Sequence, residues 1–286
     1  MISAFCPAHI TCFFRPVRSQ DIMRTGSRGA GIRLSLGTTV HMDETSGRTR
    51  VVINGKDNSA DVTRHVLEHM APDRGFDVGV TCDLPMGQGF GMSASGAIAA
   101  ALCAAEITGK SRDEAFAAAH AAEVMCGGGL GDAAGLMSEA DVPIRVREGM
   151  PPFGDITDAG FSFGDMTLAV MGRKMNTADV LGDGSKLEII SAAGDVAIRS
   201  FLAEMTKESL FKVSGRFSSE TGLRAAAVSG AIEILDGNGI SSAMCMLGNS
   251  IFINASKKEV EGILDGRAHL YGTASTAEPA RIIRRG

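Results

Sequence analysis

Residues 84–103, LPMGQGFGMSASGAIAAALC, place glycines, serines and alanines between two apolar runs. Phosphate binding at the start of a helix requires free backbone N–H groups, close approach of the main chain and no bulky Cβ. Four glycines meet the steric requirement: Gly87, Gly89, Gly91 and Gly96. Ser93 and Ser95 can cap the helix or turn a hydroxyl toward a phosphate or Mg²⁺. The segment predicts either a phosphate-binding loop or a flexible turn before a helix of small residues.

Two common nucleotide-binding motifs are excluded by the residues of this segment. It contains no Gly-Lys-Ser/Thr, so it is not a Walker A loop. The spacing Gly87-x-Gly89-x-Gly91 lacks the third glycine of a dinucleotide fold, and the acidic residue about 20 positions later is also missing. Glycine spacing alone therefore leaves both interpretations of the segment open.

The elements that must position this segment are predicted from the hydrophobic pattern. A strand over 77–83 leads into the glycines, and an Ala-rich helix, whose dipole would be positive at the loop, follows them. Other predicted strands cover 2–6, 31–40, 50–53, 165–172, 241–247, 250–255 and 281–284. Predicted helices cover 61–70, 95–107, 111–125, 132–138, 195–204, 220–235 and 257–264. Strands and helices mixed without strict alternation favour an α+β fold.

Composition narrows the class of protein further. The chain has 286 residues, 44% of them hydrophobic, which supports a substantial core. Its net charge of −5 gives no general affinity for nucleic acid, so no nucleic-acid partner is expected. No apolar run approaches the ~18 residues of a membrane span, and the six cysteines form no Cys-x-x-Cys pair. We therefore expect a cytoplasmic protein with buried thiols and no membrane partner.

The combined motifs resemble those of the GHMP kinases. The pattern Pro85-x-Gly87-x-Gly89-x-Gly91-x-Ser93 is similar to the ATP-binding motif of that superfamily. The spacing Glu123-x₈-Asp132, with glycines at 127–131 between, resembles the acidic residue of its second helix and its catalytic turn. The resemblance implies an ATP site formed by the following residues: Pro85, Gly87, Gly89, Gly91, Ser93, Ala94 and Ser95.

The same resemblance assigns roles to the acidic residues. Ser93 and Glu123 would hold the Mg²⁺ of Mg-ATP, and Asp132 would act as the general base. The alternative is a purely structural role, in which Glu123 is a solvated helix residue and Asp132 a helix N-cap.

The resemblance extends over nearly the whole chain. Residues 4–14, AFCPAHITCFF, occupy the place of the superfamily's first, substrate-side motif, with His9 where a basic residue is usual and small residues, Ala8 and Cys12, where glycines are expected. Segments 26–31, 217–223 and 246–252 fit the same pattern. The resemblance implies a two-lobed fold, with residues 1–150 forming an N-terminal lobe with a mixed sheet and the ATP loop, and residues 151–286 forming a C-terminal α/β lobe. It also implies a homodimer.

By the same resemblance, the expected activity is phosphorylation of pantoate to 4-phosphopantoate in coenzyme A biosynthesis. Pantoate requires a cation for its carboxylate, hydrogen-bond donors for its 2-hydroxyl and an apolar wall for its gem-dimethyl carbon. The candidate substrate-binding residues are His9, Ser27, His120, Arg145 and Thr177. Arg145 is the candidate carboxylate clamp, while Arg147, on the same face of a predicted strand, is its alternative.

The sequence alone leaves the roles of several residues, and several rival functions, undecided. His120 is either structural or substrate-binding, and the sequence does not rank the other possible cations, Arg28, Lys212 and Arg216. Asn249 and Ser250 fit either a ligand contact or a plain turn between two strands. Rival functions are another small-molecule kinase of the superfamily (for homoserine, mevalonate or shikimate), a non-catalytic ligand-sensing protein of the same fold, and an α+β domain without a nucleotide site.

Overall fold

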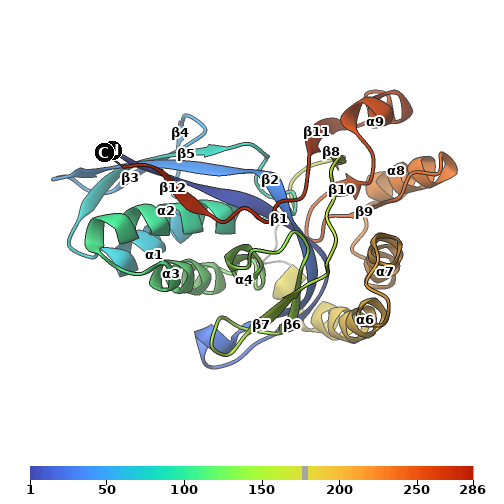
Figure 1. Cartoon of the computed structure of the whole chain (residues 1–286), viewed down its shortest axis with the longest axis horizontal. Helices are drawn as coiled ribbons and strands as arrows, with labels where there is room; N and C mark the ends of the chain where they lie inside the picture. Colours follow the sequence, from blue (N-terminus) through green and yellow to red (C-terminus); the bar gives the residue numbers. More distant parts are fainter. Residues whose placement is uncertain (176–179, 286) are drawn as a thin grey trace.

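Two β-sheets organise the molecule, as a computed structural model that describes residues 1–175 and 180–285 shows (Figure 1). The strand order of the larger sheet is β12-β1-β2-β5-β3-β4, with β6 pairing β2 and β7 pairing β6. Its strands are β1 Ile2–Val17, β2 Gly26–Thr45, β3 Arg50–Ile53, β4 Lys56–Asp57, β5 Gly75–Cys82, β6 Pro143–Arg147, β7 Asp155–Asp158 and β12 Arg281–Arg284. The smaller sheet has the order β11-β8-β10-β9, formed by His269–Thr273, Met166–Val170, Ser250–Ile253 and Ser242–Met244.

The antiparallel hairpin of β1 and β2 consists of the two longest strands of the fold. The two strands pair from Ile2↔Met42 to Val17↔Gly26, much further than the short strands predicted at 2–6 and 31–40. Most of β1 is buried on both faces, so its sequence lacks the alternation that marks a half-exposed strand. The register shifts between Pro7 and Ala8 and between Thr11 and Phe13, which places irregular backbone beside His9.

Four helices cover one face of the larger sheet: α1 Asp61–Met70, α2 Met92–Thr108, α3 Arg112–Met125 and α4 Asp132–Met137. The Ala-rich α2 is buried on nearly all sides, because its small side chains let β1, β2 and the neighbouring helices approach closely. The predicted capping box of Ser111 and Glu114 is present at the start of α3. These helices bring the ends of α2, α3 and α4 toward β1.

In the C-terminal part, α7 Lys207–Glu220, α8 Ala226–Gly237 and α9 Lys257–Leu264 pack on the smaller sheet, while α6 Gly184–Ala203 packs on β1 and α7. The predicted helix at 220–235 is present from Ala226 as α8 but starts too early, because α7 ends at Glu220 and Gly222 adopts a left-handed φ of 64° between the two helices. The predicted helix at 195–204 begins at Gly184 instead. The predicted pair of strands over 241–255 is confirmed by the pairing of β9 with β10.

Both ends of the chain return to the same region. The final strand β12 pairs antiparallel with β1, and the red and dark blue ribbons run together in Figure 1. All six cysteines are free. Within the described residues, no helix combines the length and the apolar character that crossing a membrane would require.

Candidate active site

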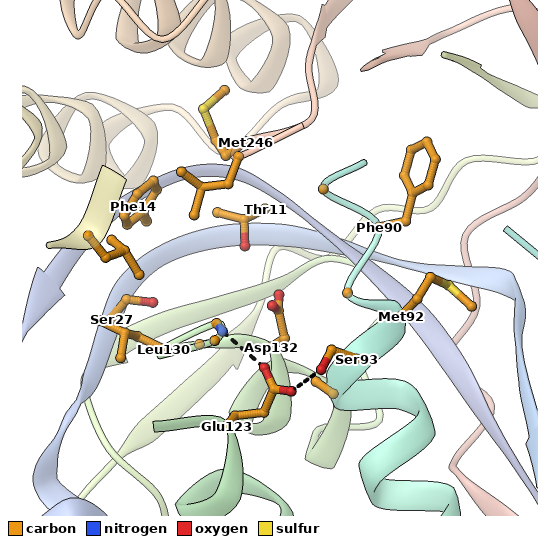
Figure 2. A pocket seen from close by; sticks show the side chains of 18 of the residues that line it. Thr11, Phe14, Ser27, Phe90, Met92, Ser93, Glu123, Leu130, Asp132 and Met246 are labelled. Atoms are coloured by element: carbon orange, nitrogen blue, oxygen red, sulfur yellow. Dashed lines mark hydrogen bonds between the residues drawn. The ribbon is translucent and has the colours of Figure 1, made fainter. Parts of the chain in front are cut away.

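One pocket lies where α2, the turn before α4 and the β1–β2 hairpin meet. Its lining residues are Thr11, Phe14, Ser27, Gly87, Gly89, Phe90, Gly91, Met92, Ser93, Ala94, Glu123, Gly128, Gly129, Leu130, Gly131, Asp132, Leu181, Met246 and Leu247. Figure 2 shows Ser93, Glu123 and Asp132 gathered on one side of the pocket, with Thr11 and Met246 on the opposite side. The structure thus brings the glycine-rich loop and both predicted carboxylates to one place.

The loop before α2 exposes main chain to the pocket. Gly87, Gly89 and Gly91 have φ values of 76°, 74° and 63°, which glycine adopts without strain. A Cβ on Gly89 would lie 2.6 Å from the carbonyl oxygen of Met246, and one on Gly91 would lie 2.7 Å from that of His9. Gly91 caps α2 without a side-chain hydrogen bond, so the first amides of the helix keep their capacity for a bound anion.

Two predicted loop residues have a different placement. Ser95 is fully buried, and its hydroxyl donates to the carbonyl oxygen of Cys6 at 2.7 Å, so it ties α2 to β1 and faces away from the pocket. Pro85 is not among the lining residues, whereas Ala94 is. Residue 87 and residues 89–94 therefore line the pocket, with Phe90 and Met92 as the large side chains among them.

Ser93 and Glu123 form a hydrogen-bonded pair across the pocket floor (Figure 2). The hydroxyl of Ser93 donates to Oε1 of Glu123, and the amide of Gly129 donates to Oε2 at 2.9 Å. Burial raises the pKa of Glu123 to about 7, and the nearby charge of Asp132 contributes to the increase. Glu123 is only 1% exposed, so it is not the solvated helix residue of the structural alternative.

Asp132 is the first residue of α4, and its side chain contacts His9 of β1. Its Oδ1 lies 2.7 Å from Nδ1 of His9, and its side chain is 21% exposed to the pocket. Burial opposes ionisation, but the hydrogen bond from His9 and the charge of Arg145 outweigh it, so the pKa of Asp132 lies below its ordinary value. Asp132 is thus an ionised carboxylate at neutral pH.

The predicted substrate residues fall into two groups. Ser27 lines the pocket, while Arg145 lies directly behind it: Nε donates to the carbonyl oxygen of Ser27 at 3.2 Å, and Nη2 is buried without a partner. A Cβ on Gly131 would lie 2.3 Å from Oγ of Ser27 and 2.6 Å from Nε of Arg145. Arg147, the alternative cation, is exposed.

His120 and His9 are both buried outside the pocket lining. The Nε2 of His120 donates to the carbonyl oxygens of Thr25 and Ile22 at 3.0 and 3.1 Å, and its Nδ1 has no partner. His120 therefore anchors the segment that leads into Ser27. Thr177 lies outside the described residues.

Asn249 and Ser250, which the sequence left open, hold the glycine-rich loop from the side of the smaller sheet. The amide of Asn249 donates to Oε1 of Gln88, and the hydroxyl of Ser250 donates to the carbonyl oxygen of Gln88 at 2.6 Å. Gln88 completes this contact by donating from Nε2 to the carbonyl oxygen of Gly172 at 2.9 Å. Asn249 also donates from Nδ2 to the carbonyl oxygen of Arg173 at 2.8 Å, so the two residues hold the loop against the smaller sheet.

Sequence reasoning missed several residues of the pocket. Thr11, Phe14, Leu130, Leu181 and Met246 line it, although none was proposed as a site residue. Thr11 and Phe14 belong to the 4–14 motif, but alternation from His9 reaches only Thr11, because the register shifts between Thr11 and Phe13. Leu130 and Met246 lie in the glycine turn at 127–131 and the segment 246–252, which were noted only as motifs, and nothing in the local sequence marks Leu181.

A glycine-rich loop before a helix, with Glu123 and Asp132 in the same pocket, is the arrangement of a GHMP kinase. The family model described as "GHMP kinases N terminal domain" matches residues 58–139. The fold is similar to a putative homoserine kinase from Listeria monocytogenes, with a TM-score of 0.66, 14% identity and all of both chains covered. The predicted α+β fold of this class is confirmed.

More specific relatives define the particular family. A solved "phosphotransferase related to CoA biosynthesis pathway" covers 98% of each chain, with a TM-score of 0.88 and 31% identity. The pantoate kinase of Thermococcus kodakarensis is 34% identical over 272 residues, covering 91% of this chain and 90% of its own. The pantoate kinase of Methanocaldococcus jannaschii is 28% identical, covering 91% and 95%. The chain belongs to the pantoate kinase family.

Proposed function

We propose that this protein transfers the γ-phosphoryl group of ATP to the primary hydroxyl of pantoate, giving 4-phosphopantoate and ADP. The observation that carries this proposal is the single pocket in which the ionised Asp132 faces a glycine-rich loop and the buried Glu123. Phosphoryl transfer needs positioning, charge neutralisation and a carboxylate that accepts the alcohol proton. Two of the relatives named above are pantoate kinases, and a third is a phosphotransferase related to the coenzyme A biosynthesis pathway, to which the product belongs.

The nucleotide is bound by the loop. The amides around Gly87, Gly89 and Gly91 face the pocket and would hold the triphosphate. A second hollow, between α1 and the start of α2, shares Met92 and Ser93 with this pocket and would take the nucleoside.

The residues present fit Mg²⁺, which binds through one or two carboxylates and the phosphates of the substrate. Ser93 and Glu123 offer oxygen ligands, and Glu123 is a buried carboxylate whose ionised form lacks a cation. They would hold the ion, whose charge would neutralise the phosphate oxygens.

Pantoate is placed at the Asp132 end of the pocket. Asp132 accepts the proton of the primary hydroxyl, and Ser27 provides a hydroxyl contact. Phe14, Leu130 and Leu181 form an apolar wall for the gem-dimethyl carbon. Arg145 is buried behind the lining, so its contact with the pantoate carboxylate stays a prediction, for which the unpartnered Nη2 would be the donor. His120 positions Ser27 by anchoring the segment before it, and a role for Thr177 stays a prediction.

The function is tested by measuring ADP release from Mg-ATP with pantoate, homoserine, mevalonate and shikimate in parallel. Turnover with pantoate alone, or far faster than with the others, is expected. Asp132→Asn is the matched control: it keeps the size of the side chain and removes the base, so turnover should be lost while Mg-ATP still stabilises the protein against heat. Equal turnover by wild type and Asp132→Asn would overturn the assignment of the base.

A homodimer, a cytoplasmic location and the absence of a nucleic-acid partner stay predictions. Light scattering coupled to size-exclusion chromatography decides the first.

A further inference from the structure

His9 is a buried histidine that the nucleotide site and the substrate pocket do not use directly. Its side chain is fully buried in β1 and absent from the pocket lining. Glycines flank its ring: a Cβ would lie 2.2 Å from Nε2 at Gly31 and 2.8 Å from it at Gly135. The ring is therefore held in one orientation by close packing, and it contacts Asp132 rather than the pocket.

The hydrogen-bond partners of His9 fix its tautomer. Nη1 of Arg145 lies 3.4 Å from Nε2, and a guanidinium has only donors, so Nε2 must accept. The proton of a neutral ring is then on Nδ1, which donates to Oδ1 of Asp132 at 2.7 Å. The neutral state agrees with burial, which lowers the pKa of His9 and outweighs the hydrogen bond to Asp132.

We infer that His9 is a positioning residue for the base: Arg145 fixes its Nδ1–H tautomer, and Nδ1–H holds Oδ1 of Asp132 so that Oδ2 is left for the substrate hydroxyl. The inference rests on the proposed function and replaces the substrate-binding role that the sequence suggested. The packing around Asp132 agrees with it, since Oδ2 points toward the pocket-lining Gly129, where a Cβ would lie only 2.3 Å away. A carboxylate held by one oxygen keeps the other at a fixed position for proton transfer.

The charges around the pair decide what losing His9 does. Arg145 and Arg33 are the positively charged side chains near His9, and Glu123 is the acidic neighbour of Asp132. Without the Nδ1–H donor, the ionised form of Asp132 loses that hydrogen bond, while burial and the hydrogen bond with Thr11 remain. The pKa of Asp132 then rises, and the acid limb of the rate profile moves to higher pH.

Two amide variants separate this role from simple packing. His9→Asn places an N–H donor where Nδ1 stands, whereas His9→Gln reaches the position of Nε2 and supplies no donor to Asp132. We expect His9→Gln to lower kcat roughly 10- to 100-fold, with little change in KM for pantoate, because the base is misaligned. His9→Asn should recover most of that loss, and its acid limb should lie closer to that of the wild type.

Either of two outcomes overturns the inference. One is a His9→Gln variant with wild-type kcat and pH profile; the other is a variant whose KM for pantoate rises while kcat is unchanged, which indicates direct substrate binding. Thermal unfolding with and without Mg-ATP establishes that each variant is folded. A wild-type protein with no pantoate turnover would instead reject the proposed function.

A readout independent of turnover also covers variants that fail to fold. Nitrogen-15 NMR of the histidine rings in the wild-type protein should show His9 neutral, with its proton on Nδ1, between pH 6 and 8. A proton on Nε2, or an imidazolium across that range, contradicts the inference whatever the enzyme phosphorylates.

Discussion

At the residue scale, the pocket holds two carboxylates with opposite pKa shifts. Burial raises the pKa of Glu123, while the partners of Asp132 keep its pKa low despite burial. Two carboxyl groups in one site commonly divide their roles in this way. In the proposed function, Asp132 accepts the proton of the substrate hydroxyl, and Glu123 is ionised beside the cation.

Glu123→Gln should stabilise the ligand-free protein at high pH. A folded-state pKa of about 7 against an ordinary 4.5 means that stability from Glu123 is complete below pH 4.5 and lost as pH rises through 7. The advantage of the variant over wild type should therefore grow by about 2 to 3 kcal/mol between pH 5 and pH 8. Denaturant unfolding of both proteins at each pH measures it.

The amide keeps both hydrogen bonds, since its oxygen can accept from the Gly129 amide and its nitrogen can donate to Ser93. Activity should fall strongly in the same variant, because the ligand for the cation is lost. If the difference in unfolding free energy between the variant and wild type does not change with pH, burial does not raise the pKa of Glu123.

The sequence located Ser93, Glu123 and Asp132 because their order and spacing along three consecutive helices are visible in the linear pattern. It could not place His9 or Arg145, since β1 and β6 meet Asp132 only after the larger sheet has formed. The linear sequence does not show whether a basic residue near a substrate motif faces the pocket or lies behind it.

At the element scale, α2 has a left-handed glycine at each end. Gly91 and Gly109 have φ values of 63° and 75°, so alanine carries a comparable backbone penalty at both. Only Gly91 meets main chain, since its Cβ would lie 2.7 Å from the carbonyl oxygen of His9, whereas nothing lies within 4 Å at Gly109. The pair therefore separates left-handed strain from close approach of the phosphate loop to β1.

Gly109→Ala should cost about 1 to 2 kcal/mol of stability and leave Mg-ATP binding unchanged. Gly91→Ala should cost clearly more and also weaken Mg-ATP binding, because the loop must move away from β1 to relieve the clash. Thermal unfolding with and without Mg-ATP measures both effects. Equal losses in the two variants would show that the tight contact between loop and strand is unimportant.

Element prediction succeeded where local signals are strong. The capping box of α3 and the helix at 61–70 are present with the predicted bounds or close to them. The extent of the β1–β2 hairpin was missed because two-sided burial leaves a continuous apolar run. Gly222 was the available signal against a helix that starts at 220, and the apolar run after it, which does form α8, favoured the longer helix.

At the scale of the whole molecule, β1 contacts both halves of the chain. Its first part packs on α2, and its last part packs on α6 and α7. The rings of Phe13 and Phe201 lie 5.6 Å apart, those of Phe14 and Phe217 lie 5.7 Å apart, and β12 closes the sheet beside β1. A division at residue 150 stays a prediction, and these contacts indicate that the two parts depend on one another.

We therefore expect one cooperative unfolding transition for the full chain, with calorimetric and van't Hoff enthalpies that agree. The fragment 1–150 should fail to fold, because Phe13 and Phe14 lose their partners and β1 loses β12. Differential scanning calorimetry and circular dichroism test both statements. Two separate transitions, or a folded fragment, would support independent lobes.

The central proposal is that the protein phosphorylates the primary hydroxyl of pantoate in this pocket, with Asp132 as the base. The most direct measurement is product identification by mass spectrometry and phosphorus-31 NMR after incubation of wild type and Asp132→Asn with Mg-ATP and pantoate. The proposal predicts a phosphopantoate whose phosphorus couples to the protons of the primary carbon, formed by wild type and not by the variant. Phosphorylation at the 2-hydroxyl, no phosphorylated pantoate, or equal product from both proteins would contradict it.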